Sequence, residues 1–263
     1  MSTALTQLLG IMAALRDPEG GCPWDRQQSF ASLAPYTLEE AYEVVDTIEQ
    51  GDAGALREEL GDLLFQVVFH AQLGAEQGLF DFDDITAALC AKLIRRHPHV
   101  FGEARIDSAA AQAAAWEQHK AAERADKGDA QGGALDGVPT ALPALTRACK
   151  LQRRAARVGF DWPEAAPVLD KLHEEIDELR AELERADPGR LEHELGDVLF
   201  ACTNLARHLG VDPETALRAA NRRFERRFRH LEKRLREQGR EVSQCPPEEL
   251  EKRWQEAKQA GDD

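Results

Sequence analysis

Apolar residues recur every three to four positions along most of this chain, which is the spacing of amphipathic helices. Two adjacent stripes are the clearest: Leu169, Leu172, Ile176, Leu179 and Leu183, followed by Leu191, Leu195, Val198, Leu199, Cys202, Leu205 and Ala206. No segment shows the alternation typical of a β-strand. The pattern therefore predicts an all-α fold.

Breaks in the stripes set the ends of the predicted helices. In the first half we expect helices over residues 4–16, 36–50, 53–77, 83–96 and about 108–126, with a loop before Pro35. In the second half we expect a basic helix after Pro143 that contains Lys150, Arg153, Arg154 and Arg157. It is followed by helices over about 164–186, 188–209, 213–238 and 247–259. Asp187 and Asp212, each followed by proline, are good N-caps for two of these helices.

The chain contains an internal duplication with an offset of 135 residues. The residues repeated at this offset are Glu39, Glu40, Glu43, Glu59, Leu60, Gly61 and Asp62, which match Glu174, Glu175, Glu178, Glu194, Leu195, Gly196 and Asp197. A shared register over about thirty residues marks a repeat too long for a solenoid unit. We therefore expect two similar domains, residues 1–125 and 140–263, joined by a polar, glycine-rich linker over 126–139.

The repeated residues place acidic pairs on the predicted helices. Glu175 and Glu178 are three residues apart, as are Glu194 and Asp197, so each pair lies on one helical face beside an apolar stripe. If the stripes pack together, four carboxylates converge, which is destabilising unless cations lie among them. Mg²⁺ prefers such oxygen ligands. Gly61 and Gly196 each cost about 1 kcal/mol inside a helix, and we expect a close helix crossing there.

The third helix of each half adds cations. Arg223 and Arg227 are four residues apart on one flank, and at an offset of 131 they align with Lys92 and Arg96. Carboxylates that hold Mg²⁺, together with Lys and Arg that offset remaining negative charge, suit a phosphate substrate. A solvated basic helix face is the alternative for these arginines.

Composition narrows the classes of protein to which the chain could belong. A net charge of −15 and a pI near 5.0 argue against a nucleic-acid partner. No apolar run approaches the roughly eighteen residues of a membrane span, and the start of the chain lacks the order of a signal peptide. Five scattered cysteines suggest buried free thiols in a reducing cytoplasm, and they make zinc an unfavoured metal.

Taken together, the motifs resemble the MazG family of nucleoside triphosphate pyrophosphohydrolases, which belongs to the all-α pyrophosphatases that also include dimeric dUTPases. The resemblance covers nearly the whole chain. It rests on the repeated E-E-x-x-E and E-x-x-D patterns and on four further segments: Cys22-Pro-Trp-Asp25, Arg96-His-Pro-His-Val-Phe101, Val158-Gly-Phe-Asp-Trp162 and Phe224-Glu-Arg-Arg-Phe228. It implies Mg²⁺-dependent cleavage of an NTP or dNTP to the monophosphate and pyrophosphate. It also implies a homodimer whose helices complete a four-helix core, and a role in nucleotide clearing or stress response.

The resemblance also implies roles for single residues. The metal ligands would be Glu175, Glu178, Glu194 and Asp197. Water would attack the α-phosphorus in line, with Glu175 or Glu178 as the base. The substrate-binding residues would be Lys171, Arg190, Arg223, Arg227 and Trp254, where Arg190 stands at a position that is often Lys in the family.

The two halves differ in their cations. Lys171 and Arg190 correspond to Tyr36 and Ala55, so we expect the C-terminal site to do most of the catalysis. The second, N-terminal site would be weaker, regulatory or structural, and it would consist of Glu40, Glu43, Glu59, Asp62, Lys92 and Arg96.

Two other functions fit four acids on helices. A di-iron bundle requires Glu-x-x-His on two helices, and none of the eight histidines follows a Glu at that spacing. A non-catalytic regulatory scaffold with vestigial acids is the second alternative, and a pyrophosphate assay distinguishes it from the enzyme. Base and sugar preference stay open, because Trp254, Phe160 or Trp162 could each stack on a base.

Overall fold

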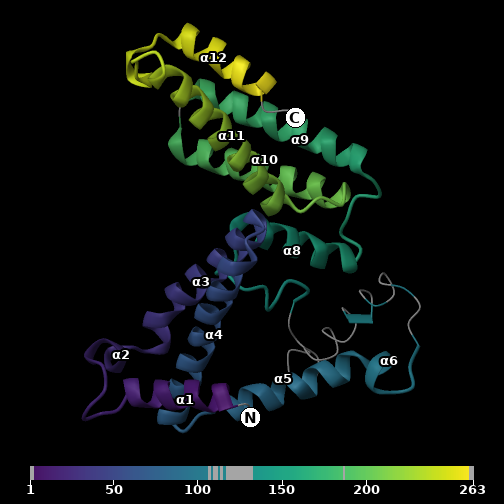
Figure 1. Ribbon diagram of the computed structural model, residues 1–263. Coiled ribbons are helices and arrows are strands. Elements are labelled where there is room, and N and C mark those ends of the chain that lie inside the picture. Colours follow the sequence, from purple (N-terminus) through teal and green to yellow (C-terminus); the bar gives the residue numbers. More distant parts are fainter. Residues whose placement is uncertain are drawn as a thin grey trace. The chain divides into compact units, whose positions relative to one another are not determined.

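The computed structural model describes residues 3–105, 108, 112, 115–116, 133–185 and 187–260, and every regular element within them is a helix (Figure 1). The prediction of an all-α fold is therefore confirmed. The chain divides into two compact units, Met1–Asp126 and Lys127–Asp263. Most of the helix expected over 108–126 lies outside the described residues, as do residues 126–132 of the expected linker.

The first unit is built around a helix pair formed by α3 and α4. Its helices are α1 (Thr3–Leu15), α2 (Pro23–Gln27), α3 (Phe30–Gln50), α4 (Ala53–Glu76), α5 (Phe82–Arg96) and α6 (Pro98–Phe101). α3 packs along α4, and α1 covers α4 (Figure 1). The core under α1 consists of Met12, Leu33, Val68, Phe69 and Leu73, all of them almost fully buried.

Helix α3 begins six residues before the predicted start, so the loop expected up to Pro35 is wrong. The backbone N–H of Ser29 donates to Ser32 Oγ at 2.9 Å, and the Ser32 N–H donates to Ser29 Oγ at 3.2 Å. This reciprocal cap satisfies the first donors of the helix. Pro35 lies early in the helix, where it removes one backbone hydrogen bond without ending the helix.

The second unit repeats this arrangement with a different cover. Its helices are α8 (Ala144–Arg157), α9 (Ala165–Arg185), α10 (Pro188–His208), α11 (Pro213–Arg236), the 3₁₀ turn η2 (Val242–Gln244) and α12 (Pro247–Ala260). α9 packs along α10, α8 covers α10, and α12 lies beside α11 (Figure 1). Asp187 accepts hydrogen bonds from the backbone of Gly189 and Arg190, and Asp212 accepts one from Thr215, so both predicted N-caps are confirmed.

The buried face of α9 differs from the predicted apolar stripe. Val168, Glu175 and Glu182 are 1%, 7% and 5% exposed, whereas Leu169 and Leu183 are exposed. The inward stripe is therefore rotated by about one residue relative to the one that hydrophobicity alone predicts. This stripe directs the carboxylates of Glu175 and Glu182 toward α10, so the second unit has two buried glutamates on α9.

Two further findings concern membrane spans and the cysteines. Within the described residues, no helix combines the length and the apolar character needed to cross a membrane. All five cysteines are described as free thiols, but only Cys149 is buried, and Cys90 and Cys202 are exposed. The expectation of buried thiols is therefore wrong for these two, which lie on outward-facing positions of α5 and α10.

Candidate active site

Helices α9 and α10 bring three acidic side chains of the second unit together. One carboxylate oxygen from each of Glu175, Glu178 and Glu194 lies within 4.8 Å of the other two. Asp197 reaches this group through Glu194, since His193, Glu194 and Asp197 also have ligand atoms within 4.8 Å of one another. We call these four acids the C-terminal acid group. Glu194 is its centre, because it belongs to both clusters.

Lys171 is the cation that the structure places at this group. Its Nζ lies 2.9 Å from Glu174 Oε1 and 2.9 Å from Glu175 Oε1. Hydrogen bonds first to Glu174 and then to Glu175 raise the pKa of Lys171 well above its usual value, so it stays charged. Glu175 is thus both buried and paired with a cation.

Glu178 occupies a different environment in the same group. Its side chain is exposed, and no ion pair to it is found in the described part of the unit. Loss of hydration beside the helix pair, followed by the nearby charge of Glu175, raises the pKa of Glu178. Its exposure and its raised pKa make Glu178 a candidate proton acceptor.

His193 lies beside the acids and was not predicted. Its Nδ1 is 3.1 Å from Asp197 Oδ2 and 3.7 Å from Glu194 Oε1, and its side chain is 74% exposed. The duplication gave no hint of it, because Glu58 occupies the corresponding position. The signal that could have found it is the four-residue spacing between His193 and Asp197, which places both on one helical face.

The other predicted cations lie elsewhere in the unit. Arg190 Nη1 is 3.4 Å from Glu182 Oε1, so this arginine pairs with the second buried glutamate of α9. Arg223 is exposed and Arg227 is half-buried on α11, which packs mainly against α12 and α8 and only lightly against α10. Lys171 thus makes an ion pair to the acid group itself, whereas Arg190 makes one to Glu182.

Trp254 belongs to an aromatic cluster between α11 and α12. Its ring centroid lies 5.2 Å from that of Phe224, which stacks on Phe228 at 5.9 Å. Phe224 is 56% exposed. The cluster gives the outer side of this helix pair an apolar aromatic surface beside the arginines.

The first unit has a similar acid cluster, but Tyr36 stands where the second unit has Lys171. Ligand oxygens of Glu40, Glu59 and Asp62 lie within 4.8 Å of one another. Burial and then the charge of Asp62 raise the pKa of Glu40, while burial and then the charge of Glu43 raise the pKa of Glu59. All four predicted acids of this unit therefore interact electrostatically.

The cations of the first unit do not reproduce those of the second. Tyr36 stands in the place of Lys171, and its ring meets that of Trp24 at 5.9 Å. Lys92 is half-buried on α5, and the guanidinium of Arg96 lies 4.9 Å from the ring of Trp116. In the first unit an aromatic residue, Tyr36, thus occupies the position of the lysine that pairs with the acids of the second unit.

The repeated glycines do not mark a close helix crossing within either unit. A Cβ atom at Gly61 or Gly196 would meet no atom within 4 Å. The expectation of a crossing at these glycines is therefore wrong for the single chain. Both lie on open faces of α4 and α10, next to the exposed Leu60 and Leu195.

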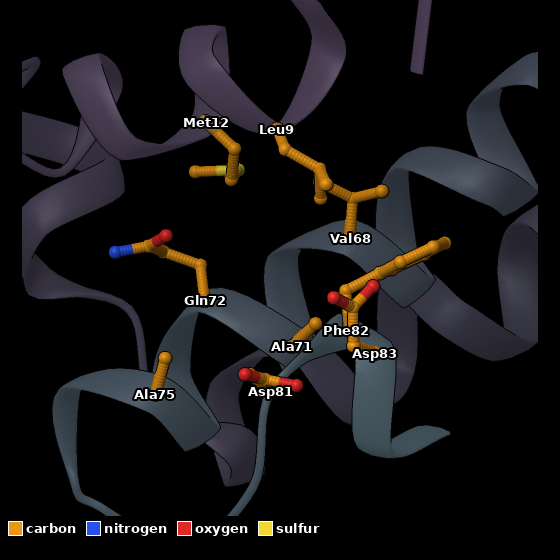
Figure 2. A pocket seen from close by; sticks show the side chains of 9 residues that line it. All are labelled: Leu9, Met12, Val68, Ala71, Gln72, Ala75, Asp81, Phe82 and Asp83. Carbon is orange, nitrogen blue, oxygen red and sulfur yellow. The ribbon is translucent and has the colours of Figure 1, made fainter. Parts of the chain in front are cut away.

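A small cavity in the first unit lies away from the acids. Figure 2 shows Leu9 and Met12 of α1 facing Val68 and Ala71 of α4 across this space, which has a volume of about 190 Å³. Asp81 at its edge accepts a hydrogen bond from the backbone N–H at the start of α5, so its carboxylate serves as a cap. None of the predicted site residues lines this cavity.

Comparison with known proteins supplies the family. The model of the MazG nucleotide pyrophosphohydrolase domain matches residues 28–101 and 165–232, which contain both acid clusters. The nucleoside triphosphate pyrophosphohydrolase of Escherichia coli (strain K12) is 54% identical over 256 residues, which is 97% of each chain.

Two relatives of lower identity are also similar over nearly the whole of this chain. The Thermotoga maritima nucleoside triphosphate pyrophosphohydrolase/pyrophosphatase MazG is 44% identical over 252 residues, covering 96% of this chain and 94% of that protein. The uncharacterized protein YabN of Bacillus subtilis (strain 168) is 42% identical over 250 residues, covering 95% of this chain and 50% of its own length. With the duplicated domain match and this near-complete coverage, the chain belongs to the MazG nucleotide pyrophosphohydrolase family.

Proposed function

We propose that this protein hydrolyses nucleoside triphosphates, NTPs or dNTPs, between the α- and β-phosphates, and so releases the monophosphate and pyrophosphate. The observation that carries the proposal is the convergence of Glu175, Glu178 and Glu194 within 4.8 Å. The printed names of the relatives from E. coli and T. maritima support the same reaction class. Clearing of nucleotides, in general or under stress, is the physiological role that we propose.

The acid group suits Mg²⁺. Its ligands would be Glu175, Glu178, Glu194 and Asp197, all of them oxygen donors of the kind that this cation prefers. Loss of hydration and then the charge of Glu175 raise the pKa of Glu178, and a divalent cation at the group would offset this negative charge. When bound, Mg²⁺ would offset the charge of the acids and of the triphosphate, and so supply electrostatic stabilisation.

We assign the proton acceptor to Glu178 in preference to Glu175. Glu175 is buried and held by Lys171, whereas Glu178 is exposed, has no such partner and has a raised pKa. Glu178 would take the proton of a water that attacks the α-phosphorus in line, and pyrophosphate would leave. Lys171 would counter the negative charge of the substrate beside Glu175.

The remaining cations and Trp254 would bind the substrate from α10, α11 and α12. We propose phosphate contacts for Arg223 and Arg227, and a nucleotide contact for Trp254, from the adjacent helix pair. Arg190 is the weaker candidate, because its guanidinium is engaged by Glu182 at 3.4 Å. The N-terminal acids would form a weaker, regulatory or structural site, since Tyr36 replaces the lysine.

Replacement of the proposed base is the decisive test. Glu178→Ala should abolish pyrophosphate release from a mixture of NTPs with Mg²⁺, while the helical circular dichroism signal stays near wild type. Asp177→Ala is the matched control, because Asp177 is the neighbouring acid in the sequence and pairs with the exposed Arg180. Turnover that survives Glu178→Ala, or that falls equally in Asp177→Ala, contradicts the assignment.

We also propose that the protein is a homodimer. Leu183, Leu195 and Leu199 on α9 and α10 are 64%, 50% and 50% exposed in the single chain, and the space beside Gly196 is open. A second copy that covers this apolar face would complete a four-helix core. Light scattering after size exclusion should give twice the chain mass for wild type and a smaller value for Leu199→Glu. A monomeric wild type refutes the dimer.

A further inference from the structure

His193 lies beside the acid group on α10 and has no role in the proposed reaction. Its Nδ1 lies 3.1 Å from Asp197 Oδ2 and 3.7 Å from Glu194 Oε1. The side chain is 74% exposed, so the ring is not a packed part of the core. Imidazole nitrogen and carboxylate oxygen are donors with which proteins bind divalent transition metals. The contacts of this histidine therefore raise the question of a metal ligand.

The acid group contains two overlapping sets of ligand atoms. Oxygens of Glu175, Glu178 and Glu194 lie within 4.8 Å of one another, and this first set has oxygen donors alone. Ligand atoms of His193, Glu194 and Asp197 also lie within 4.8 Å of one another, and we call these three residues the histidine set. Because Glu194 belongs to both sets, its carboxylate is placed to bridge two cations.

The separations within the histidine set fit the ligands of one cation. Metal bonds of about 2.0–2.2 Å place neighbouring nitrogen and oxygen ligands roughly 3.0–3.5 Å apart. The distance of 3.1 Å from His193 Nδ1 to Asp197 Oδ2 lies within this range. The distance of 3.7 Å to Glu194 Oε1 exceeds it slightly, and a small rotation of the exposed ring would close the difference. A neutral imidazole can carry its proton on Nε2, which leaves the Nδ1 lone pair for the metal.

The first unit has an oxygen donor at the corresponding position. By the 135-residue offset, Glu58 stands where the second unit has His193. Burial first, and then the charges of nearby acids that include Glu58, raise the pKa of Glu59, so this position also acts on the acids of the first unit. The cluster of that unit, formed by Glu40, Glu59 and Asp62, has oxygen donors alone. The nitrogen donor is therefore a property of the second half.

A nitrogen ligand changes which cation the histidine set prefers. Mg²⁺ takes oxygen ligands and dehydrates reluctantly, whereas imidazole suits divalent transition metals. Carboxylates can bind cations of both classes. A neutral histidine in place of a glutamate also removes one negative charge, which weakens the purely electrostatic attraction for Mg²⁺. His193 thus shifts the preference of this set away from Mg²⁺ and toward a transition metal.

We propose that His193, Glu194 and Asp197 form a second cation position, which takes a divalent transition metal through Nδ1 of His193. The inference rests on the proposed function and deepens it, because the second cation joins the same acid group. Glu194 is common to both positions, and the proposed Mg²⁺ keeps the oxygens of Glu175 and Glu178. A second cation offsets more of the negative charge that the acids and a triphosphate bring together.

Pulsed electron paramagnetic resonance of the full chain loaded with Mn²⁺ tests the histidine ligand. Mn²⁺ suits carboxylates, so it enters the acid group with or without the imidazole. Wild type should show modulation from a directly bound nitrogen, and His193→Glu, which installs the residue of the first unit, should lose it. His173→Ala is the matched control and should keep the signal. His173 is another exposed histidine of the same unit, and its Nδ1 lies 2.9 Å from the backbone oxygen of Leu169.

Isothermal calorimetry measures the change in preference. In His193→Glu the affinity of the tightest Co²⁺ site should fall about tenfold, which corresponds to about 1.4 kcal/mol, while the affinity for Mg²⁺ should stay the same or rise. Equal changes for both cations would contradict the proposal. If wild type releases pyrophosphate but shows no nitrogen modulation, or if His193→Glu keeps that modulation, the histidine ligand is refuted and the function stands. If wild type hydrolyses no triphosphate but the modulation disappears in His193→Glu, the function is refuted and the metal ligand remains.

Discussion

Glu194→Gln should make the protein more stable and inactive at once. Glu194 is the acid shared by both clusters, with carboxylate oxygens of Glu175, Glu178 and Asp197 within 4.8 Å. Glutamine keeps the shape of the side chain and removes the charge. Functional groups that repel one another are held together at a cost in stability, which the rest of the fold offsets.

The size of the effect follows from the geometry. Two unit charges about 4.8 Å apart repel by about 1 kcal/mol in water and by about 3 kcal/mol at an effective dielectric near 20. The Glu194 side chain is 21% exposed, and Lys171 partly balances Glu175, so the lower part of this range applies. We expect a net stabilisation of about 1–2 kcal/mol, which corresponds to a rise in melting temperature of roughly 2–8 °C.

Thermal unfolding with and without Mg²⁺ measures this effect. Without the cation, Glu194→Gln should melt above wild type, and the difference should narrow as salt screens the charges. With Mg²⁺, wild type should gain stability and the variant should gain little, while its pyrophosphate release is lost. Glu192→Gln is the control, because it makes the same charge change on an exposed face of α10. A Glu194→Gln protein that melts at or below both wild type and this control would refute the mutual repulsion.

Two further predictions concern stability against pH and the ranking of the sites. Asp161→Asn should lower stability by about 1–3 kcal/mol at neutral pH, because it weakens a charge-assisted pair that is only partly exposed. The hydrogen bonds from Arg207 lower the pKa of Asp161, so this contribution is present above an unfolded-state pKa of about 3.9 and disappears as pH falls through the depressed folded-state pKa. Urea midpoints that differ equally at pH 7 and about pH 2 would exclude that linkage. Glu194→Ala should reduce pyrophosphate release far more than Glu59→Ala, and a larger loss from Glu59→Ala would reverse the ranking of the two sites.

The sequence by itself determined most of the long helices, two of their caps and the repeat. Each depends on residues close together in the chain: the apolar period, the Asp-Pro pairs at Asp187 and Asp212, and the acids three apart on one face. The family followed from the same local motifs, because their order and spacing are written along the chain. The start of α3 was missed, since Pro35 was weighted above the reciprocal cap at Ser29.

Only the tertiary structure decided how far each helix is rotated toward its neighbour. The period of α9 is the same whether Leu169 or Val168 faces inward, and packing against α10 selected Val168, Glu175 and Glu182. That rotation buried Glu175 and left Glu178 exposed, a distinction that spacing alone does not make. A cavity of about 280 Å³ beside Asn204 likewise depends on contacts between α8, α10 and the segment 158–164 that joins α8 to α9, which are distant in sequence. Local chemistry sets the spacing along a helix, whereas the environment of each side chain is set by the surfaces that pack against it.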